Sequence, residues 1–273
     1  MGKLYVVATP IGNLKDITLR ALEVLKSVPV IACEDTRQTM KLLNHYQIKG
    51  KKLISYYQPK EDIQIPKILE ILKEGLNVAL VTDAGTPAIS DPGYRLIKKC
   101  IEEGIDVEVI PGPSAVITAL VGSGLPTDRF LFLGFPPKKG LKNFFENFSG
   151  VDATFVLYEA PTRVLKTLEV IKEVFKNPPT VVAKELTKLH EEFIRGETTQ
   201  EVIEFFKQNP DRLRGEFVIM FRPGEEIKEE LPLEDIVSKL KEEGLSAKDI
   251  YKKLKEEGYK VDRRKVYEIY NQS

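Results

Sequence analysis

The amino-acid sequence predicts an α/β protein made of two α/β domains and a small helical appendage. Short Val- and Ile-rich runs alternate with amphipathic stretches at the start of the chain, strand-like runs with fewer helices follow, and helical spacing dominates the end. The chain has 273 residues, 42% of them hydrophobic, so each domain can bury its own core. We expect boundaries at residues 1–124, 125–224 and 225–273.

The first domain is expected to contain a mostly parallel sheet. Its apolar runs are short enough for strands, and the apolar residues between them recur at helical spacing. Strands that alternate with crossover helices form parallel sheets. The expected strands are residues 4–8, 30–32, 53–57, 78–81 and 107–110, and the helices are centred on Leu22, Leu69 and Ile97.

The second domain begins where small residues and Pro126 interrupt this pattern, at residues 122–126. Fewer helices separate its strand-like runs, and the late runs are close enough for a hairpin, which predicts a mixed α/β domain. The expected strands are residues 130–135, 154–158, 180–183, 193–196 and 217–221.

The appendage follows a charged stretch at residues 225–230, which is expected to be an exposed linker. Apolar residues then recur at helical spacing in residues 233–240, 250–254 and 266–270, with turns at Gly244 and Gly258. This pattern predicts three helices in a helix-turn-helix-like arrangement.

Composition excludes several classes of protein. The 41 basic and 41 acidic side chains cancel, so any affinity for nucleic acid must come from local patches. Cys33 and Cys100 are too few for a disulfide framework, and His45 and His190 lack the spacing of metal ligands, so no metal is expected. No stretch has the length of a membrane span or the form of a signal peptide, which indicates a cytoplasmic protein.

Four loops after expected strands have unusual compositions, and ligands of open α/β sheets bind beyond the carboxyl ends of the strands. The loop at residues 9–14 is neither a GxGxxG motif nor a P-loop. Residues 33–37 place two carboxylates before a helix that Asp35 or Thr36 can cap. Residues 82–93 are rich in small, turn-forming residues, and residues 111–115 let Ser114 cap a helix while free amides face a cleft.

These loops resemble the tetrapyrrole methylase superfamily and, within it, the branch that methylates small-subunit ribosomal RNA. The resemblance covers almost the whole chain and depends on motifs that occur in the family's order. The motifs are residues 9–18, 34–37, 83–87, 91–94, 111–115 and 124–130 in the first part, and residues 158–163, 184–188 and 214–216 in the second.

The resemblance implies a homodimer of two-domain subunits, with S-adenosylmethionine bound in the cleft between the two α/β domains. It implies methylation of the ribose 2'-hydroxyl of a cytidine in the decoding region of 16S rRNA, on naked RNA or on the small ribosomal subunit. The residues expected at the cofactor are Ile11, Asp83, Thr86, Ser114, Ala115, Tyr158 and Leu186.

Methyl transfer to a ribose hydroxyl requires an in-line approach and removal of a proton from a weak acid. A general base, or a cation that stabilises the developing alkoxide, would assist. The candidates are Glu34, Arg37, Lys184 and Glu185, with Asp35 and Glu159 as further possibilities. Salt bridges, helix caps and phosphate contacts are alternative roles for each of them.

RNA contacts are expected at two places. The resemblance aligns the family's basic loop with residues 134–142, which contain Lys138 and Lys139. In the appendage, Arg263, Arg264 and Lys265 form a local basic run near Lys260, although nearby acids also allow an ordinary solvated surface.

Two other functions fit the same sequence. A tetrapyrrole or corrinoid precursor C-methyltransferase would use the same cofactor cleft, but the Pro-containing form of residues 9–14 and the appendage favour the RNA branch. A noncatalytic RNA-binding assembly factor would have kept the fold without binding S-adenosylmethionine.

Overall fold

The computed structural model describes residues 1–224, 233–256 and 261–272, which form two compact units, Met1–Gly224 and Glu225–Ser273. The expected linker at residues 225–230, the turn at Gly258 and the side chain of Lys260 lie outside the described residues. The two units are treated separately below.

The first sheet of the larger unit is entirely parallel, as the sequence predicts. Its strand order is β3-β2-β4-β1-β5, and each of the four pairings is parallel. The carboxyl ends of all five strands therefore lie at one edge. The strands are β1 (Leu4–Val7), β2 (Val30–Cys33), β3 (Lys52–Ser55), β4 (Val78–Val81) and β5 (Val107–Ile110).

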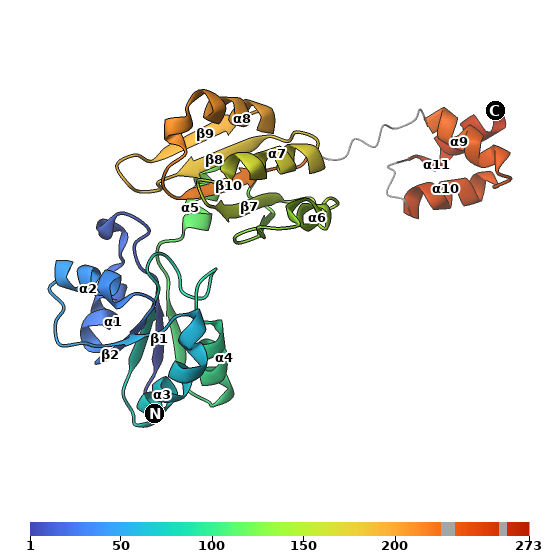
Figure 1. Ribbon diagram of the computed structural model, residues 1–273. Coiled ribbons are helices and arrows are strands. Elements are labelled where there is room, and N and C mark those ends of the chain that lie inside the picture. The colour runs from blue at the N-terminus through green and yellow to red at the C-terminus, as the bar shows by residue number, and fades with distance from the viewer. Residues whose placement is uncertain (225–232, 257–260, 273) are drawn as a thin grey trace. The chain divides into compact units, whose positions relative to one another are not determined.

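Helices cover both faces of this sheet (Figure 1). Alternate side chains of a strand point to opposite faces, so Val6 packs toward α3 and α4 whereas Val7 packs toward α1 and α2. The helices are α1 (Leu19–Ser27), α2 (Thr36–His45), α3 (Glu61–Lys73) and α4 (Tyr94–Glu102), with short 3-10 turns η1 (Leu14–Asp16) and η2 (Gln58–Lys60).

The second sheet is mixed, which confirms the predicted change in character. Its order is β6-β7-β10-β8-β9; β6 and β7 are parallel, and the other pairings are antiparallel. The predicted hairpin is β8 and β9. The strands are β6 (Phe130–Phe132), β7 (Thr154–Glu159), β8 (Thr180–Lys184), β9 (Glu192–Gly196) and β10 (Phe217–Phe221).

A phenylalanine-rich core fills one face of the second sheet, under α6 (Leu141–Glu146), α7 (Val164–Val174) and α8 (Thr199–Gln208). The 3-10 turn η3 (Pro210–Arg212) follows α8. Phe155 of β7 is fully buried there and stacks on Phe221 of β10, with ring centroids 4.9 Å apart. The strands alternate, so Val156 and Val218 point to the opposite face.

That opposite face is covered by α5 (Ala115–Ser123), a helix that follows the last strand of the first sheet. Val116 and Leu120 pack on the second sheet, and Gly122 lies against Phe193 of β9. A Cβ atom at position 122 would be 2.4 Å from the Phe193 ring, so any larger residue would have to displace this ring or the helix. The first half of the chain thus supplies a helix to the core of the second.

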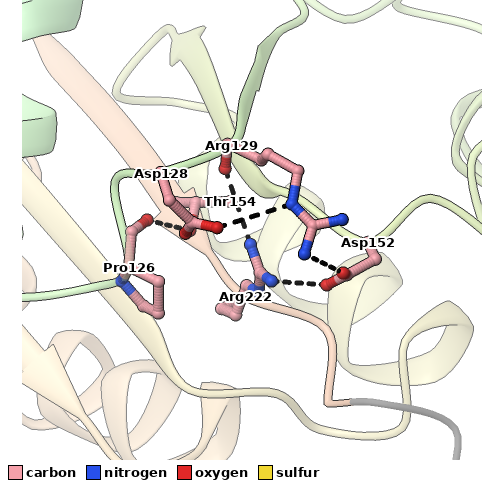
Figure 2. Close-up of polar contacts among 6 residues, drawn as sticks. All are labelled: Pro126, Asp128, Arg129, Asp152, Thr154 and Arg222. Atoms are coloured by element: carbon pink, nitrogen blue, oxygen red, sulfur yellow. Dashed lines mark hydrogen bonds and ion pairs between the residues drawn. The ribbon is translucent and has the colours of Figure 1, made fainter.

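The connection from α5 to β6 is held by side chains at the edge of the second sheet (Figure 2). The Thr154 hydroxyl donates to the Pro126 carbonyl at 2.6 Å, and the Arg129 guanidinium pairs with Asp152 at 2.6 Å. Arg222, just after β10, also pairs with Asp152. One carboxylate therefore joins the beginning and the end of this domain.

The smaller unit has the three predicted helices, α9 (Leu233–Glu242), α10 (Ala247–Glu256) and α11 (Arg263–Gln272). The apolar residues that predicted them form its core, which contains Val237, Leu240, Ile250, Leu254, Val266 and Ile269. In the part of the chain that the structure describes, no helix has the length and apolar character needed to cross a bilayer.

Candidate active site

A cavity of about 430 Å³ lies where the loops at the carboxyl edge of the first sheet meet the second sheet. Its volume falls within the range of small-molecule sites. Side chains from both halves of the larger unit line it: Ile11, Glu34, Thr82, Asp83, Ala84, Gly85, Thr86, Ile89, Ser90, Asp91, Ser114 and Ala115 from the first, and Phe135, Tyr158, Glu159, Ala160, Pro161, Leu186, Gly215, Glu216, Phe217 and Val218 from the second.

A two-residue bridge, Thr9 with Gly85, joins the loops after β1 and β4 beside the cavity. The backbone N–H of Thr9 donates to the Gly85 carbonyl at 2.9 Å, and the Gly85 N–H donates back at 3.0 Å. Gly85 has a φ of +87°, a conformation that favours glycine. A Cβ atom here would meet Ile11 Cγ2 at 3.4 Å, an ordinary contact distance, so it is the backbone conformation that favours glycine at this position.

The loop after β1 also contacts the loop after β8, which closes one end of the cavity. Ile11 packs beside Leu186, and the Asn13 N–H donates to the Thr187 hydroxyl at 3.1 Å. Gly12 lies so close to this loop that a Cβ atom would be 2.9 Å from the Leu186 carbonyl oxygen. The small residues of the first loop therefore allow the two loops to meet.

Backbone strain is concentrated around the cavity. Ala88 and Ser90 in the loop after β4, and Glu185 and Thr187 in the loop after β8, have positive φ angles between 51° and 70°. Left-handed backbone is costly for such residues, and most of all for the β-branched Thr187. Strain of this kind persists where the surroundings hold it in place and is common at ligand sites.

The lining is strongly acidic. It contains five carboxylates and no lysine, arginine or histidine. Glu159 accepts from the Thr167 hydroxyl at 2.6 Å, and Glu216 pairs with Lys188 at 3.0 Å. The other three, Glu34, Asp83 and Asp91, have no ion pair among the described residues. Their charge is available to a cationic ligand.

Burial and mutual repulsion raise the pKa values of these three carboxyls. Burial, followed by the charge of Glu34, raises the pKa of Asp91 to about 6. Burial, followed by the charge of Asp83, raises the pKa of Glu34, and burial also raises that of Asp83. The Thr82 hydroxyl donates to Glu34 Oε2 at 3.2 Å, and the repulsion between the Glu34 and Asp91 charges couples the titration of the two carboxyls.

All of the residues expected at the cofactor line this one cavity: Ile11, Asp83, Thr86, Ser114, Ala115, Tyr158 and Leu186. Ser114 is the N-cap of α5, as predicted, and its hydroxyl accepts from the Ile117 N–H at 3.4 Å. The Thr86 hydroxyl donates to the Pro113 carbonyl at 3.3 Å and so ties together the loops after β4 and β5.

Of the catalytic candidates in the first domain, Glu34 lines the cavity and Arg37 does not. Asp35 is the N-cap of α2, which confirms one of the two predicted caps. It also binds the Arg37 guanidinium through both oxygens, at 3.1 and 2.7 Å, and this pairing lowers the pKa of Asp35 to about 2. The Arg37 side chain is otherwise exposed.

Lys184 and Glu185 also lie outside the lining of the cavity. The buried Lys184 ammonium donates to the Arg212 carbonyl at 2.7 Å. Glu185 accepts from the Glu216 N–H at 3.0 Å and pairs with Lys188 at 3.1 Å. Both side chains therefore hold the loops that form the wall beside Gly215.

Asp91 is a cavity carboxylate that the sequence candidates did not include. The sequence could have indicated Asp91, because it follows Ser90 in the same small-residue loop as Asp83. Sequence alone does not show that this loop turns back so that both acids face Glu34.

The residues expected to contact RNA are exposed. Lys138 and Lys139 follow Pro136 and Pro137, whose carbonyls accept from the Arg163 guanidinium at 3.1 and 2.9 Å. In the smaller unit, Arg263, Arg264 and Lys265 are exposed at the start of α11, and the Arg263 guanidinium lies over the Tyr267 ring.

The two sheets and the cavity between them match a known class of enzyme. The chain belongs to the tetrapyrrole (corrin/porphyrin) methylase family, whose model matches residues 3–201. Solved structures with this fold include the cobalamin biosynthetic enzyme cobalt precorrin-4 methyltransferase, at a TM-score of 0.58 and 19% identity, covering 81% of this chain and 94% of that one. A uroporphyrin-III C-methyltransferase from Thermus thermophilus, complexed with S-adenosyl homocysteine, has a TM-score of 0.57 at 19% identity, covering 81% and 97%.

Curated relatives are far more similar in sequence, and they share the name ribosomal RNA small subunit methyltransferase I. The relative from Hydrogenobaculum sp. is 56% identical over 80% of this chain and 94% of its own length. That from Halalkalibacterium halodurans is 41% identical over all of this chain and 96% of its own. That from Escherichia coli O157:H7 is 44% identical over 85% and 81%. The resemblance seen in the sequence motifs is confirmed.

Proposed function

We propose that this chain transfers a methyl group from S-adenosylmethionine to the ribose 2'-hydroxyl of a cytidine in the decoding region of 16S rRNA. The observation that carries the proposal is the 41–56% identity, over most of each chain, to relatives named ribosomal RNA small subunit methyltransferase I. Family membership makes the chain a methyltransferase. The cavity described above is the proposed cofactor site.

The cavity has the chemical character that this cofactor needs. S-adenosylmethionine, when bound, supplies a reactive methyl group on a positively charged sulfur. Glu34, Asp83 and Asp91 provide unpaired negative charge for a cationic ligand, while Ile11 and Leu186 provide apolar surface. The N-terminal amides of α5, capped by Ser114, are available for further polar contacts.

We propose Asp91 as the group that accepts the proton from the ribose hydroxyl. It lines the cavity, and its pKa of about 6 keeps it ionised, yet still basic, near neutral pH. Glu34 acts on Asp91 through its charge, which raises the pKa of Asp91. Arg37, Lys184 and Glu185 remain candidates for contacts to RNA or for support of the site.

The acid limb of the pH profile tests this assignment. As the pH falls through about 6, Asp91 becomes protonated, so kcat/KM is expected to fall about tenfold per pH unit below that value. A bound cation lowers the pKa of a nearby carboxyl, so the limb in kcat is expected at a lower pH than the limb in kcat/KM. Steady-state methylation rates between pH 4.5 and 8 measure both limbs.

The variant Glu34→Gln tests whether the acid limb belongs to Asp91, and Glu102→Gln is its control. Removing the Glu34 charge is expected to lower the pKa of Asp91 and move the acid limb of kcat/KM to lower pH. Glu102→Gln, which alters an exposed carboxylate on α4, should leave the limb in place. A limb that does not move with Glu34→Gln would contradict the assignment of Asp91.

Methyl transfer itself can be tested with labelled S-adenosylmethionine and small ribosomal subunits from a strain that lacks the modification. We expect labelled 2'-O-methylcytidine after digestion of the RNA. Cofactor binding without any label in RNA would withdraw the rRNA assignment and favour methylation of a tetrapyrrole or corrinoid precursor. Absence of cofactor binding would favour the noncatalytic assembly factor.

The identity to relatives named ribosomal RNA small subunit methyltransferase I favours the RNA enzyme over the tetrapyrrole enzyme. We also propose a homodimer, which light scattering of the purified protein would test, and a location in the bacterial cytoplasm, where the ribosomes are.

A further inference from the structure

An exposed phenylalanine lines the cavity. The Phe135 side chain is 62% exposed, although a phenylalanine ring stabilises a protein mainly when it is buried. Among the described residues, two large exposed apolar side chains line the cavity, Phe135 from the second domain and Ile89 from the first. Ligand pockets are lined mainly by apolar and aromatic side chains, so an uncovered ring in this position indicates a surface for a ligand.

The Phe135 ring lies in the part of the cavity that contains Asp91. Its centroid is 5.3 Å from that of the Tyr158 ring. Burial, followed by the charge of Asp91, raises the pKa of Tyr158 to about 12, so the Tyr158 hydroxyl lies within range of that charge. The loop of Phe135 also touches the loop after β4, because a Cβ atom on Gly134 would be 3.1 Å from the Ser90 hydroxyl oxygen.

The backbone on both sides of Phe135 is held in place. Before it, the Gly134 carbonyl accepts from the Tyr158 N–H at 2.9 Å. After it, Pro136 is buried, and its carbonyl accepts from the Arg163 guanidinium at 3.1 Å. A ring presented by a fixed backbone loses little conformational freedom when a ligand binds, which favours affinity.

The proposed substrate requires a surface for a base near Asp91. In a nucleotide the base is attached to C1' of the ribose and the 2'-hydroxyl to the adjacent carbon, so a hydroxyl that reaches Asp91 brings its base to the same cavity. A base in this position has left the stack of the RNA, which costs free energy. Stacking on an aromatic side chain offsets part of that cost, because every base has a face that can stack.

We propose that Phe135 stacks on the base of the nucleotide whose ribose is methylated. This inference rests on the proposed function for the identity of the RNA. The stack holds the nucleotide at the cavity without identifying it, because stacking tolerates any base. Phe135 thus acts on the base, whereas Lys138 and Lys139, which follow it in the chain, are expected to meet the RNA backbone.

Phe135→Ala is expected to lower kcat/KM for unmodified small ribosomal subunits by about 5- to 150-fold, the usual effect of losing one stack between a base and an aromatic ring. The exposed ring contributes little to the fold, so the variant should unfold at nearly the wild-type urea concentration. Phe135→Tyr keeps the stacking face and should stay close to wild type. Phe135→Leu is apolar but has no aromatic face, so it should lose activity as Phe135→Ala does. Steady-state methylation with labelled cofactor measures all three variants.

Phe130→Ala is the control, because Phe130 is 43% exposed in the same stretch of chain but does not line the cavity. It should keep the wild-type kcat/KM. The affinity for S-adenosylmethionine, measured by calorimetry, should be unchanged in Phe135→Ala. Wild-type kcat/KM in Phe135→Ala or in Phe135→Leu would overturn the proposal. A loss of cofactor affinity in Phe135→Ala would also overturn it, since the ring would then contact the cofactor instead of the base.

A tryptophan at position 135 reports the stack directly, because the sequence contains no tryptophan. The fluorescence of Phe135→Trp is expected to be quenched when protein-free small-subunit rRNA binds. Stacking involves no charge, so Phe135→Ala should bind this RNA more weakly with the same slope of log K against log salt. Bound RNA without quenching, or a changed slope, would contradict the stack. RNA that quenches the tryptophan but is never methylated by the wild type would instead withdraw the proposed function and leave the stacking surface standing.

Discussion

Asp91→Asn is expected to lower kcat for methyl transfer by about 10²- to 10⁴-fold, the usual contribution of a general base. The amide keeps the size of the carboxyl and one acceptor oxygen but cannot accept the ribose proton. Single-turnover methylation with saturating cofactor and ribosomal subunits measures the chemical step. A residual rate above one tenth of wild type would contradict the assignment of Asp91 as proton acceptor.

The same substitution is expected to stabilise the protein without ligand. Between the ordinary Asp pKa of 3.8 and its folded value of about 6, the folded state binds more protons than the unfolded state, so stability falls as the pH rises through this window. Above pH 6 the Asp91 carboxylate is ionised in the folded protein, so its full desolvation penalty lowers the free energy of unfolding. Asp91→Asn should therefore raise the free energy of unfolding at pH 7.5 by about 1–2 kcal/mol, given about 1.4 kcal/mol per pKa unit and partial solvent screening.

Thermal unfolding at pH 7.5 and at pH 4 separates the stability effect from a general effect of mutation. The gain from Asp91→Asn should be smaller at pH 4, where much of the wild-type carboxyl is already protonated. Glu102→Gln should show no such pH-dependent gain. A destabilised Asp91→Asn protein would mean that the carboxylate is structural, and the loss of activity would then need another explanation.

Phe155→Ala is expected to destabilise the larger unit by about 3–5 kcal/mol, the usual cost of removing a buried phenylalanine. Phe155 is fully buried and packs against Phe175 and Phe221, so a cavity would remain among rigid aromatic neighbours. Urea unfolding monitored by circular dichroism measures the loss.

Phe130→Ala is the matched control, because Phe130 is on the neighbouring strand β6 but is 43% exposed. Its cost should be below about 1 kcal/mol, since little burial is lost. Equal costs for the two substitutions would show that the aromatic core does not hold the second sheet together. The cofactor affinity of folded Phe155→Ala should stay near wild type, because Phe155 points to the helix-covered face of the sheet. Its neighbours Val156 and Tyr158 point to the other face, on the side of the cavity.

The ten strands, the parallel first sheet, the mixed second sheet and the three C-terminal helices could be predicted from the sequence. Each depends on local information: the period of the apolar residues, their β-branched composition and the turn residues between them. Helix caps are equally local, so Ser114 and one of the two proposed caps of α2 were found in the same way.

The motif at residues 9–14 and the loops after β4 and β5 also marked where a ligand would bind, because ligand sites follow the carboxyl ends of parallel strands. Methyl transfer and the RNA substrate were inferred from the family resemblance, since neither follows from the spacing of residues. The seven expected cofactor residues lie together because the loops after β1, β4, β5 and β8, the start of α5 and the end of β7, which are far apart in the sequence, meet at the cavity.

Only the tertiary structure decided which charged residues face the cavity and which do not. Arg37 and Glu185 are next to site residues in the sequence, but the nearby partners Asp35 and Lys188 hold them outside the lining. Asp91 faces Glu34 because the strained turn at Ala88 and Ser90 brings it back. Side-chain direction, burial and the pKa of a carboxyl depend on neighbours that are distant in the sequence, and no local pattern records them.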